Sequence, residues 1–120
     1  MAEYAPIFKP GQEFTRTTSA AVTAGQLLSV SGNDTVAPTS AADAAWIGVA
    51  AFDAASGADV TVLTGGVHEL GATGAIAAGA NVVGATAGTV ATVGAGTAFQ
   101  VVGVALSAAA SSKVRVKLAR

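Results

Sequence analysis

The chain has 120 residues, a formal net charge of −1 and no cysteine. This length is typical of one domain, the lack of cysteine excludes disulfides and thiolate chemistry, and the near-neutral balance gives no sign of nucleic-acid or anionic-membrane binding. Only 11% of the residues are charged, against about 25% in an average soluble domain, and no residue from 70 to 112 is charged. Because a free monomer normally carries more surface charge, we expect a partner to cover part of the surface. The alternative is a monomer coated by Thr, Ser and Gly.

The first segment, residues 1–13, is predicted to be an extended arm. Pro6 and Pro10 disfavour both a helix and an interior strand, yet the segment is rich in bulky apolar side chains that a solvated tail would lack. The arm therefore either packs on its own domain or docks on a neighbouring protein. For docking, the candidate contact residues are Tyr4, Pro6, Ile7, Phe8, Lys9, Pro10 and Phe14. The segment has no apolar signal-peptide core, so we expect synthesis in the cytoplasm.

Alternation of apolar and polar residues predicts short strands along the rest of the chain, as where Val60 and Val62 alternate with Asp59 and Thr61. In the first half, strands are expected at 14–18, 26–31, 35–38, 46–51 and 59–64, with 33–34 as a hairpin tip. A short helical turn near 40–45, where the stretch is rich in Ala, is left open. In the second half, strands are expected at 67–70, 80–84, 89–92, 99–105 and 113–118.

The two sets of strands repeat one another in sequence. Four separated blocks agree in the same order, at an offset of 54 or 55 residues. The matching blocks are 22–25 with 76–79, 35–37 with 89–91, 47–50 with 102–105, and 60–62 with 114–116. Collinear agreement of this kind predicts an internal duplication, with pseudo-repeats at about 14–66 and 67–120.

The predicted fold class is all-β, a small barrel or sandwich built from this duplication, with little helix and with residues 14–120 as one domain. Four glycines are expected to have structural roles. Gly48 and Gly103 lie inside strands, where glycine often marks a bulge or a close approach of backbones. Gly25 and Gly79 lie where turns need a positive φ.

The last predicted strand places Lys113, Arg115 and Lys117 on one face, a candidate basic face. Such a face could meet an acidic partner. The alternative is a charged edge strand that resists aggregation. Because no aromatic residues are interleaved with these cations, the pattern does not indicate nucleic-acid binding.

No pattern of residues indicates catalysis, a metal or a cofactor. His68 is the single histidine, the seven acidic residues are scattered, and no G-x-S-x-G motif is present. The glycine-rich run at 84–96 lacks the G-K-[ST] ending of a phosphate loop, and its glycines interrupt any membrane span. We therefore expect no enzyme activity, no small-molecule substrate and no membrane contact.

The duplicated pattern resembles the small capsid decoration, or cement, proteins of tailed phages. The resemblance rests on the blocks VTAGQLLSVSG…TVAPTS, WIGVAAFDAASGADVTVLTGGVHEL, AIAAGANVVGATAGTVATVGAG and VVGVALSAAASSKVRVKL, which cover nearly the whole chain beyond the arm. It implies a β-rich structural protein, made in the host cytoplasm, that binds the outer surface of the expanded head as a trimer. The implied partners are the major capsid protein and further copies of the chain, and the implied role is to brace the shell against DNA pressure.

A different virion or surface β-module, such as a tail or carbohydrate-binding adhesion domain, is the alternative function. Carbohydrate sites usually use exposed aromatic residues. Outside the arm, the aromatic residues that could serve are Trp46, Phe52 and Phe99.

Overall fold

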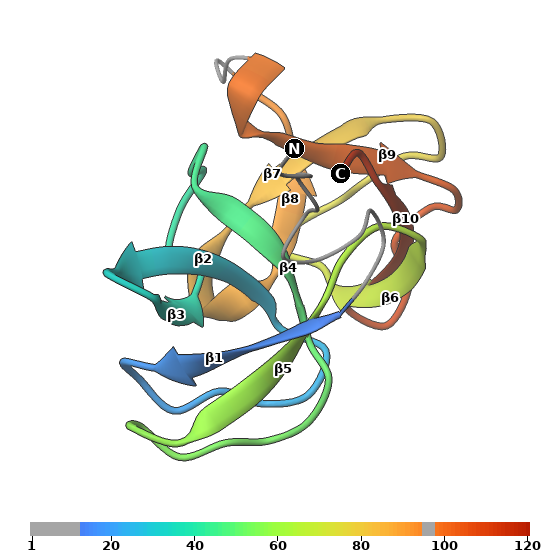
Figure 1. Ribbon diagram of the computed structural model, residues 1–120. Coiled ribbons are helices and arrows are strands. Elements are labelled where there is room, and N and C mark those ends of the chain that lie inside the picture. The colour runs from blue at the N-terminus through green and yellow to red at the C-terminus, as the bar shows by residue number, and fades with distance from the viewer. Residues whose placement is uncertain (1–12, 95–97) are drawn as a thin grey trace, which may run out of the picture.

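Strands form where Val, Leu and Ile alternate with polar residues, because alternate side chains of a strand point to opposite faces. The computed structural model describes residues 13–94 and 98–120, and the strands dominate these residues (Figure 1). In the first half they are β1 (Phe14–Thr18), β2 (Leu27–Gly32), β3 (Thr35–Pro38), β4 (Trp46–Ala50) and β5 (Asp59–Leu63). In the second half they are β6 (Val67–Gly71), β7 (Asn81–Gly84), β8 (Val90–Thr92), β9 (Val101–Ala105) and β10 (Lys113–Leu118).

These strands confirm the predicted all-β class and agree with the expected bounds to within two residues. Two 3₁₀ turns, Thr86–Gly88 and Ala98–Gln100, are the helical elements of the described residues. The expectation of a helical turn at 40–45 is wrong. There, Ala44 and Ala45 form a tight turn in which the Asp43 carboxylate accepts the Ala45 N–H at 2.8 Å. So short a segment could not repay the cost of helix nucleation before β4 begins.

The first half closes into a five-stranded barrel with the order β1-β3-β2-β4-β5 (Figure 1). β1 closes it by pairing with β5 antiparallel and with β3 parallel, where Thr18 pairs with Val36. The second half repeats this order with the equivalent strands, β6-β10-β9-β7-β8. Its outer strands meet through a single parallel bridge, Ala72 to Val90, which is the Thr18–Val36 pair displaced by 54 residues.

The hydrophobic cores repeat in the same way. The first barrel encloses a cluster of six buried residues: Val22, Leu28, Val36, Ala50, Val60 and Val62. The residues at the equivalent positions of the second half all belong to its buried cluster: Ile76, Val82, Val90, Ala105, Val114 and Val116. Because all six buried positions hold apolar residues in both halves, the duplication is one of packing as well as of sequence.

The second cluster also contains Leu27, Trp46 and Val49 from the first half. Neighbouring residues of β2 and β4 thus point into different cores, with Leu27 and Val49 turned to the second half and Leu28 and Ala50 turned into the first barrel. This two-sided burial explains why β2 and β4 do not alternate between apolar and polar residues. Side chains of both halves thus pack together in one cluster.

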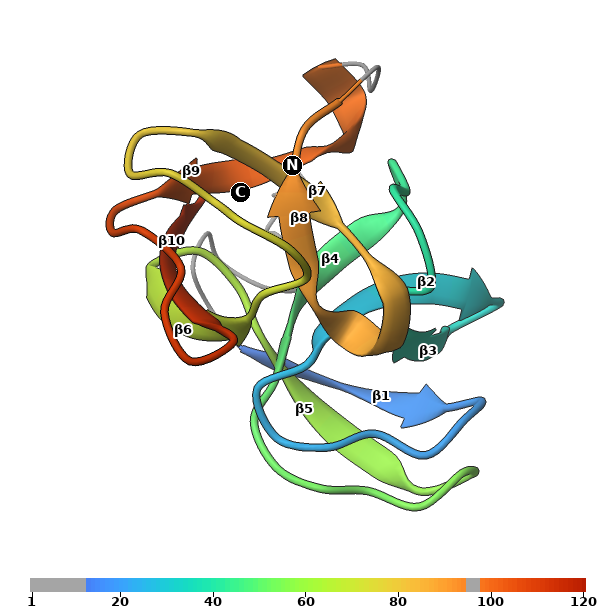
Figure 2. The ribbon, with the colours of Figure 1, turned by 180° about the vertical axis from the view of Figure 1, so that it is seen from behind.

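Polar contacts join the halves beside this apolar junction. Figure 2 shows the connection between β7 and β8 lying against β2 and β3. There, buried Thr39 donates its hydroxyl to the Ala85 carbonyl at 3.0 Å and accepts the Gly88 N–H at 2.9 Å with its own carbonyl. Gln26 donates its side-chain amide to the Ala87 carbonyl at 3.0 Å.

Gly48 and Gly103 occupy equivalent bulges in β4 and β9. The register shifts beside each of them, and a Cβ would lie 2.4 Å from the Leu63 carbonyl oxygen at Gly48 and 2.0 Å from the Lys117 carbonyl oxygen at Gly103. Backbone atoms cannot move aside as a flexible side chain can, so both positions require the absence of a side chain. Each bulge re-aims the strand so that the sheet can curve tightly.

Gly25 and Gly79 are the third residues of the turns that lead into β2 and β7, turns closed by hydrogen bonds from Gln26 to Thr23 and from Ala80 to Ala77. Their φ angles are +85° and +86°, in the region that favours glycine. Each donates its N–H to an equivalent carbonyl, Ala50 for Gly25 at 2.8 Å and Ala105 for Gly79 at 2.7 Å.

Candidate interaction surfaces

Of the residues predicted to form the arm contact, Phe14 is the one that lies in the described part of the chain. Tyr4, Pro6, Ile7, Phe8, Lys9 and Pro10 lie outside the described residues. Phe14 lies in β1, paired with Val62 of β5, and its ring is partly buried against the core cluster of the first barrel. The Arg16 guanidinium lies 5.1 Å from the centroid of this ring. Phe14 therefore packs on its own barrel, at the start of the described chain.

A surface depression of about 490 Å³ lies where the described chain begins. It is lined by Glu13 and by residues 63–68, the connection between the two halves. His68, the second residue of β6, forms a 2.8 Å hydrogen bond between its Nε2 and the Gly65 carbonyl. In the described ranges, no three His, Asp or Glu side chains gather in a way that could hold a metal ion.

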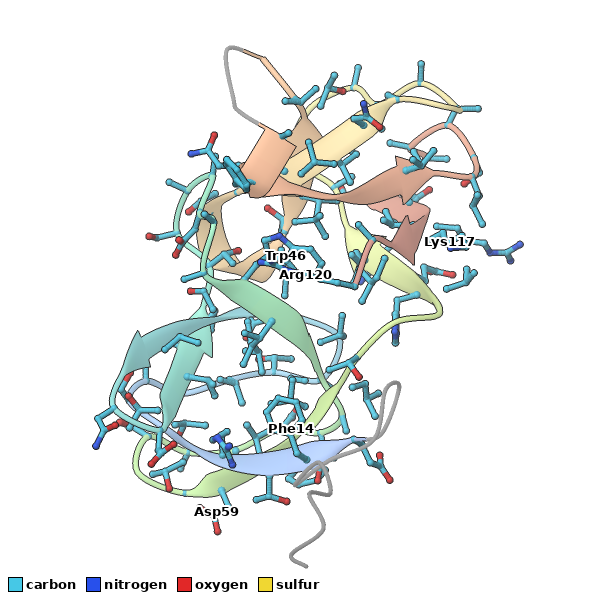
Figure 3. The ribbon with its side chains drawn as sticks, turned by 45° about the horizontal axis from the view of Figure 1, so that its top comes forward. Phe14, Trp46, Asp59, Lys117 and Arg120 are labelled. Carbon is cyan, nitrogen blue, oxygen red and sulfur yellow. The ribbon has the colours of Figure 1, made fainter. Side chains whose placement is uncertain are left out.

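The predicted basic face exists, but β10 is not an edge strand. β10 lies between β6 and β9, so the interpretation of its cations as edge protection is wrong. Val114, Val116 and Leu118 are buried in the core, so the residues that alternate with them point to the opposite, exposed face. Lys113, Arg115 and Lys117 stand together on the outer face of a paired sheet, and Figure 3 shows Lys117 directed outward.

Apolar side chains accompany these cations on the same face. Lys117 pairs in register with Val67 of β6 on one side and Val104 of β9 on the other, and these valines are 54% and 40% exposed. Leu106 follows β9, where its N–H bonds to the Arg115 carbonyl, and it is 51% exposed. We call the surface formed by Val67, Val104, Leu106, Lys113, Arg115 and Lys117 the basic face. Exposed apolar groups gathered in this way are typical of interaction sites.

An acidic edge lies on the first barrel and was not anticipated from the sequence. Near the end of β1, Thr17 pairs with Asp59 of β5 on one side and with Thr35 of β3 on the other. Asp34, in the β2–β3 turn just before Thr35, therefore lies near the same end of β1 as Asp59. The Asp34 side chain is 80% exposed, and Figure 3 places Asp59 at the far edge of the barrel. We call the surface formed by Thr17, Ser19, Ser31, Asp34, Thr35 and Asp59 the acidic edge.

Hydroxyl groups connect the residues of the acidic edge. Thr17 donates to Asp59 Oδ1 at 3.0 Å, and Ser31 bonds to both Ser19 and Thr35, at 2.6 and 3.1 Å. Arg16 Nε comes within 3.9 Å of Asp34, which makes one long ion pair. The edge therefore carries two carboxylates on a polar, hydrogen-bonded base.

The aromatic residues considered for carbohydrate binding do not form one surface set. Trp46 is 1% exposed and lies at the junction of the halves, with the Arg120 guanidinium 4.4 Å from its ring centroid (Figure 3). The expectation that Trp46 could contact a ligand is therefore wrong. Phe52 and Phe99 are exposed, at 47% and 78%.

In the described part of the chain, no helix is long and apolar enough to cross a membrane.

Comparison with known proteins agrees with the architecture. The family model described as phage cement protein matches residues 8–120. The crystal structure of the N-terminal base of the head fibre protein gp8.5 of bacteriophage phi29 is similar to this fold, with a TM-score of 0.69, 20% sequence identity, and coverage of 90% of this chain and 93% of that one. No curated protein matches the sequence.

Proposed function

This chain belongs to the phage cement protein family, and from that premise we propose that it decorates the outer surface of the expanded phage head and stabilises the shell. Membership of the family makes it a structural protein of the phage head. The observation that carries the proposal is the extent of the family match, residues 8–120, which includes both β halves and the end of the arm.

The proposed partner on the head is the major capsid protein, and the proposed contact is the arm. Tyr4, Ile7 and Phe8 supply apolar anchors, with Pro6 and Pro10 holding the segment extended and Lys9 adding a charge. An extended segment can add a strand to a partner or place its aromatic rings in pockets. Phe14, packed on the first barrel, would fix the arm to the body of the protein.

We further propose that the protein acts as a trimer. A trimer would engage several capsid subunits at once, so weak contacts would add up on the symmetric lattice. A protein that binds the expanded shell and not other states stabilises the expanded state by mass action. This is how a decoration protein would resist the outward pressure of packaged DNA.

The first test is the copy number of the chain in purified virions, measured by quantitative mass spectrometry against the major capsid protein. A ratio near one is expected for a component of the whole shell. A few copies per particle, or none, would contradict shell decoration and would favour a tail or adhesion module.

The arm contact is tested by the binding of the full chain to expanded heads that lack it. The variant Tyr4→Ala/Ile7→Ala/Phe8→Ala should bind at least about tenfold more weakly, since loss of buried aromatic anchors typically costs 2 kcal/mol or more. Glu3→Ala/Gln12→Ala, which alters polar residues of the same segment, is the control and should bind normally. Equal binding by both variants would remove the arm from the proposed contact.

A further inference from the structure

Charge is divided between the two halves of this chain. Residues 13–66 contain five acidic side chains and one basic one, a net charge of −4. Residues 67–120 contain one acidic and four basic side chains, a net charge of +3. The overall charge of −1 is therefore the sum of an acidic half and a basic half.

The cations of the basic face are not neutralised by described residues of the same copy, whereas on the acidic edge Asp34 has one long ion pair with Arg16. Among the described residues, Lys113, Arg115 and Lys117 have no carboxylate within ion-pair distance, although Glu69 is the register partner of Arg115. Their alternation with buried residues of β10 turns them outward, and the acidic edge lies on the barrel of the first half. The three cations are thus left for a partner, and Asp34, whose side chain is 80% exposed, remains accessible to one beside its long ion pair.

The basic face has the composition of a contact surface. Three apolar side chains, exposed by 40% to 54%, lie beside its cations. The stems of Lys and Arg can cover such apolar groups while their charged ends reach a partner. A partner for this face needs carboxylates at its rim, and the acidic edge of the same chain has two.

We infer that the basic face of one copy docks on the acidic edge of a second copy, in a head-to-tail contact. A cyclic trimer requires two different and complementary surfaces on each copy, because only a two-fold dimer can use one patch twice. A two-fold contact through the basic face would bring like charges together and is disfavoured. The inference rests on the proposed trimer and assigns the surfaces that build it.

The contact is tested by exchanging its charges. The basic-face variant is Lys113→Gln/Lys117→Glu, which lowers the net charge by three, and the acidic-edge variant is Asp34→Asn/Asp59→Lys, which raises it by three. Asparagine suits position 34 because the φ of Asp34 is +57°, a conformation that asparagine tolerates. The combined variant carries all four changes and has the net charge of the natural chain.

Self-association is measured by sedimentation equilibrium at low and high salt. Each single-face variant should lower the association constant at least about tenfold, and the combined variant should recover most of it. Salt should weaken association of the natural chain. If the combined variant associates as poorly as the single-face variants, the inference is wrong. Unfolding of each variant, followed by Trp46 fluorescence, shows whether the fold is intact.

Cross-linking on decorated heads tests the contact in the case that copies associate only on the shell. A zero-length carbodiimide joins amines to carboxylates in direct contact, and a mixture of ¹⁵N-labelled and unlabelled copies identifies links between copies. Links from Lys113 or Lys117 of one copy to Asp34 or Asp59 of another are expected. Links from these lysines to the capsid protein, to other carboxylates of a second copy, or to no second copy at all would overturn the inference. Binding to heads is read separately, so failure of the contact is distinguishable from failure of the proposed function.

Discussion

Replacing Gly103 with alanine tests whether the bulge in β9 requires glycine. A Cβ at this position would lie 2.0 Å from the Lys117 carbonyl oxygen and 3.0 Å from Val116 Cγ1, where real contacts start near 3.0 Å. β9 and β10 would have to separate by about 1 Å, and the obstacle is backbone, so no rotamer change relieves it. Gly48→Ala is the equivalent change in the first half, with the Leu63 carbonyl oxygen at 2.4 Å.

The expected cost of Gly103→Ala is about 3 kcal/mol, the upper end for overpacking. For a domain of this size, 1 kcal/mol corresponds to roughly 3–5 °C in Tm, so the expected fall is roughly 9–15 °C. Gly48→Ala should cost somewhat less, because its contact is less close. Gly94→Ala is the control, since no atom of the described residues lies within 4 Å of a Cβ there and its φ is not in the left-handed region. It should be neutral or stabilising by up to about 1 kcal/mol.

The assay is urea unfolding followed by fluorescence of Trp46, the single tryptophan, at one fixed protein concentration. Trp46 is buried between the halves, so its emission reports the loss of the shared core. A Gly103→Ala variant within 0.5 kcal/mol of the Gly94→Ala control, as an approximate threshold for a neutral surface change, would refute the close approach of β9 and β10.

Three further predictions concern the junction of the halves and use the same unfolding assay. Arg120→Ala should cost about 1–3 kcal/mol, because the guanidinium donates to the carbonyls of Ala44 and Trp46 at 2.8 Å and lies over the Trp46 ring. An unchanged unfolding midpoint would show that these contacts do not stabilise the fold. Thr39→Val should cost about 1–3 kcal/mol by leaving the Ala85 carbonyl without its donor, whereas Thr39→Ser should keep most of that stability, so equal losses would refute the role of the hydroxyl. Leu27→Ala should cost about 2–5 kcal/mol through a cavity between the halves, and a cost below about 1 kcal/mol would mean that the junction is not tightly packed.

The candidate surfaces were only partly predictable. The cations of β10 follow a strict alternation, so the sequence places them on one face without any knowledge of strand order. The acidic edge has no such signal, because Asp34 and Asp59 are far apart in the chain and meet only through their common neighbour β1. Val67 and Val104 join the basic face for the same reason, through pairing with β10 on its two sides.

By itself, the sequence determined the all-β class, the strand bounds and the duplication, because period-two patterns, turn residues and repeated blocks are local properties of the chain. Tertiary structure decided what depends on strand pairing. It placed β10 inside a sheet rather than at an edge, and it buried Trp46 at the junction of the halves. It also closed the first barrel through a parallel β1–β3 pair. Both faces of β2 and β4 must be buried, one in each hydrophobic cluster. Which distant segments cover those two faces is decided by tertiary packing, and no local pattern in the sequence encodes it.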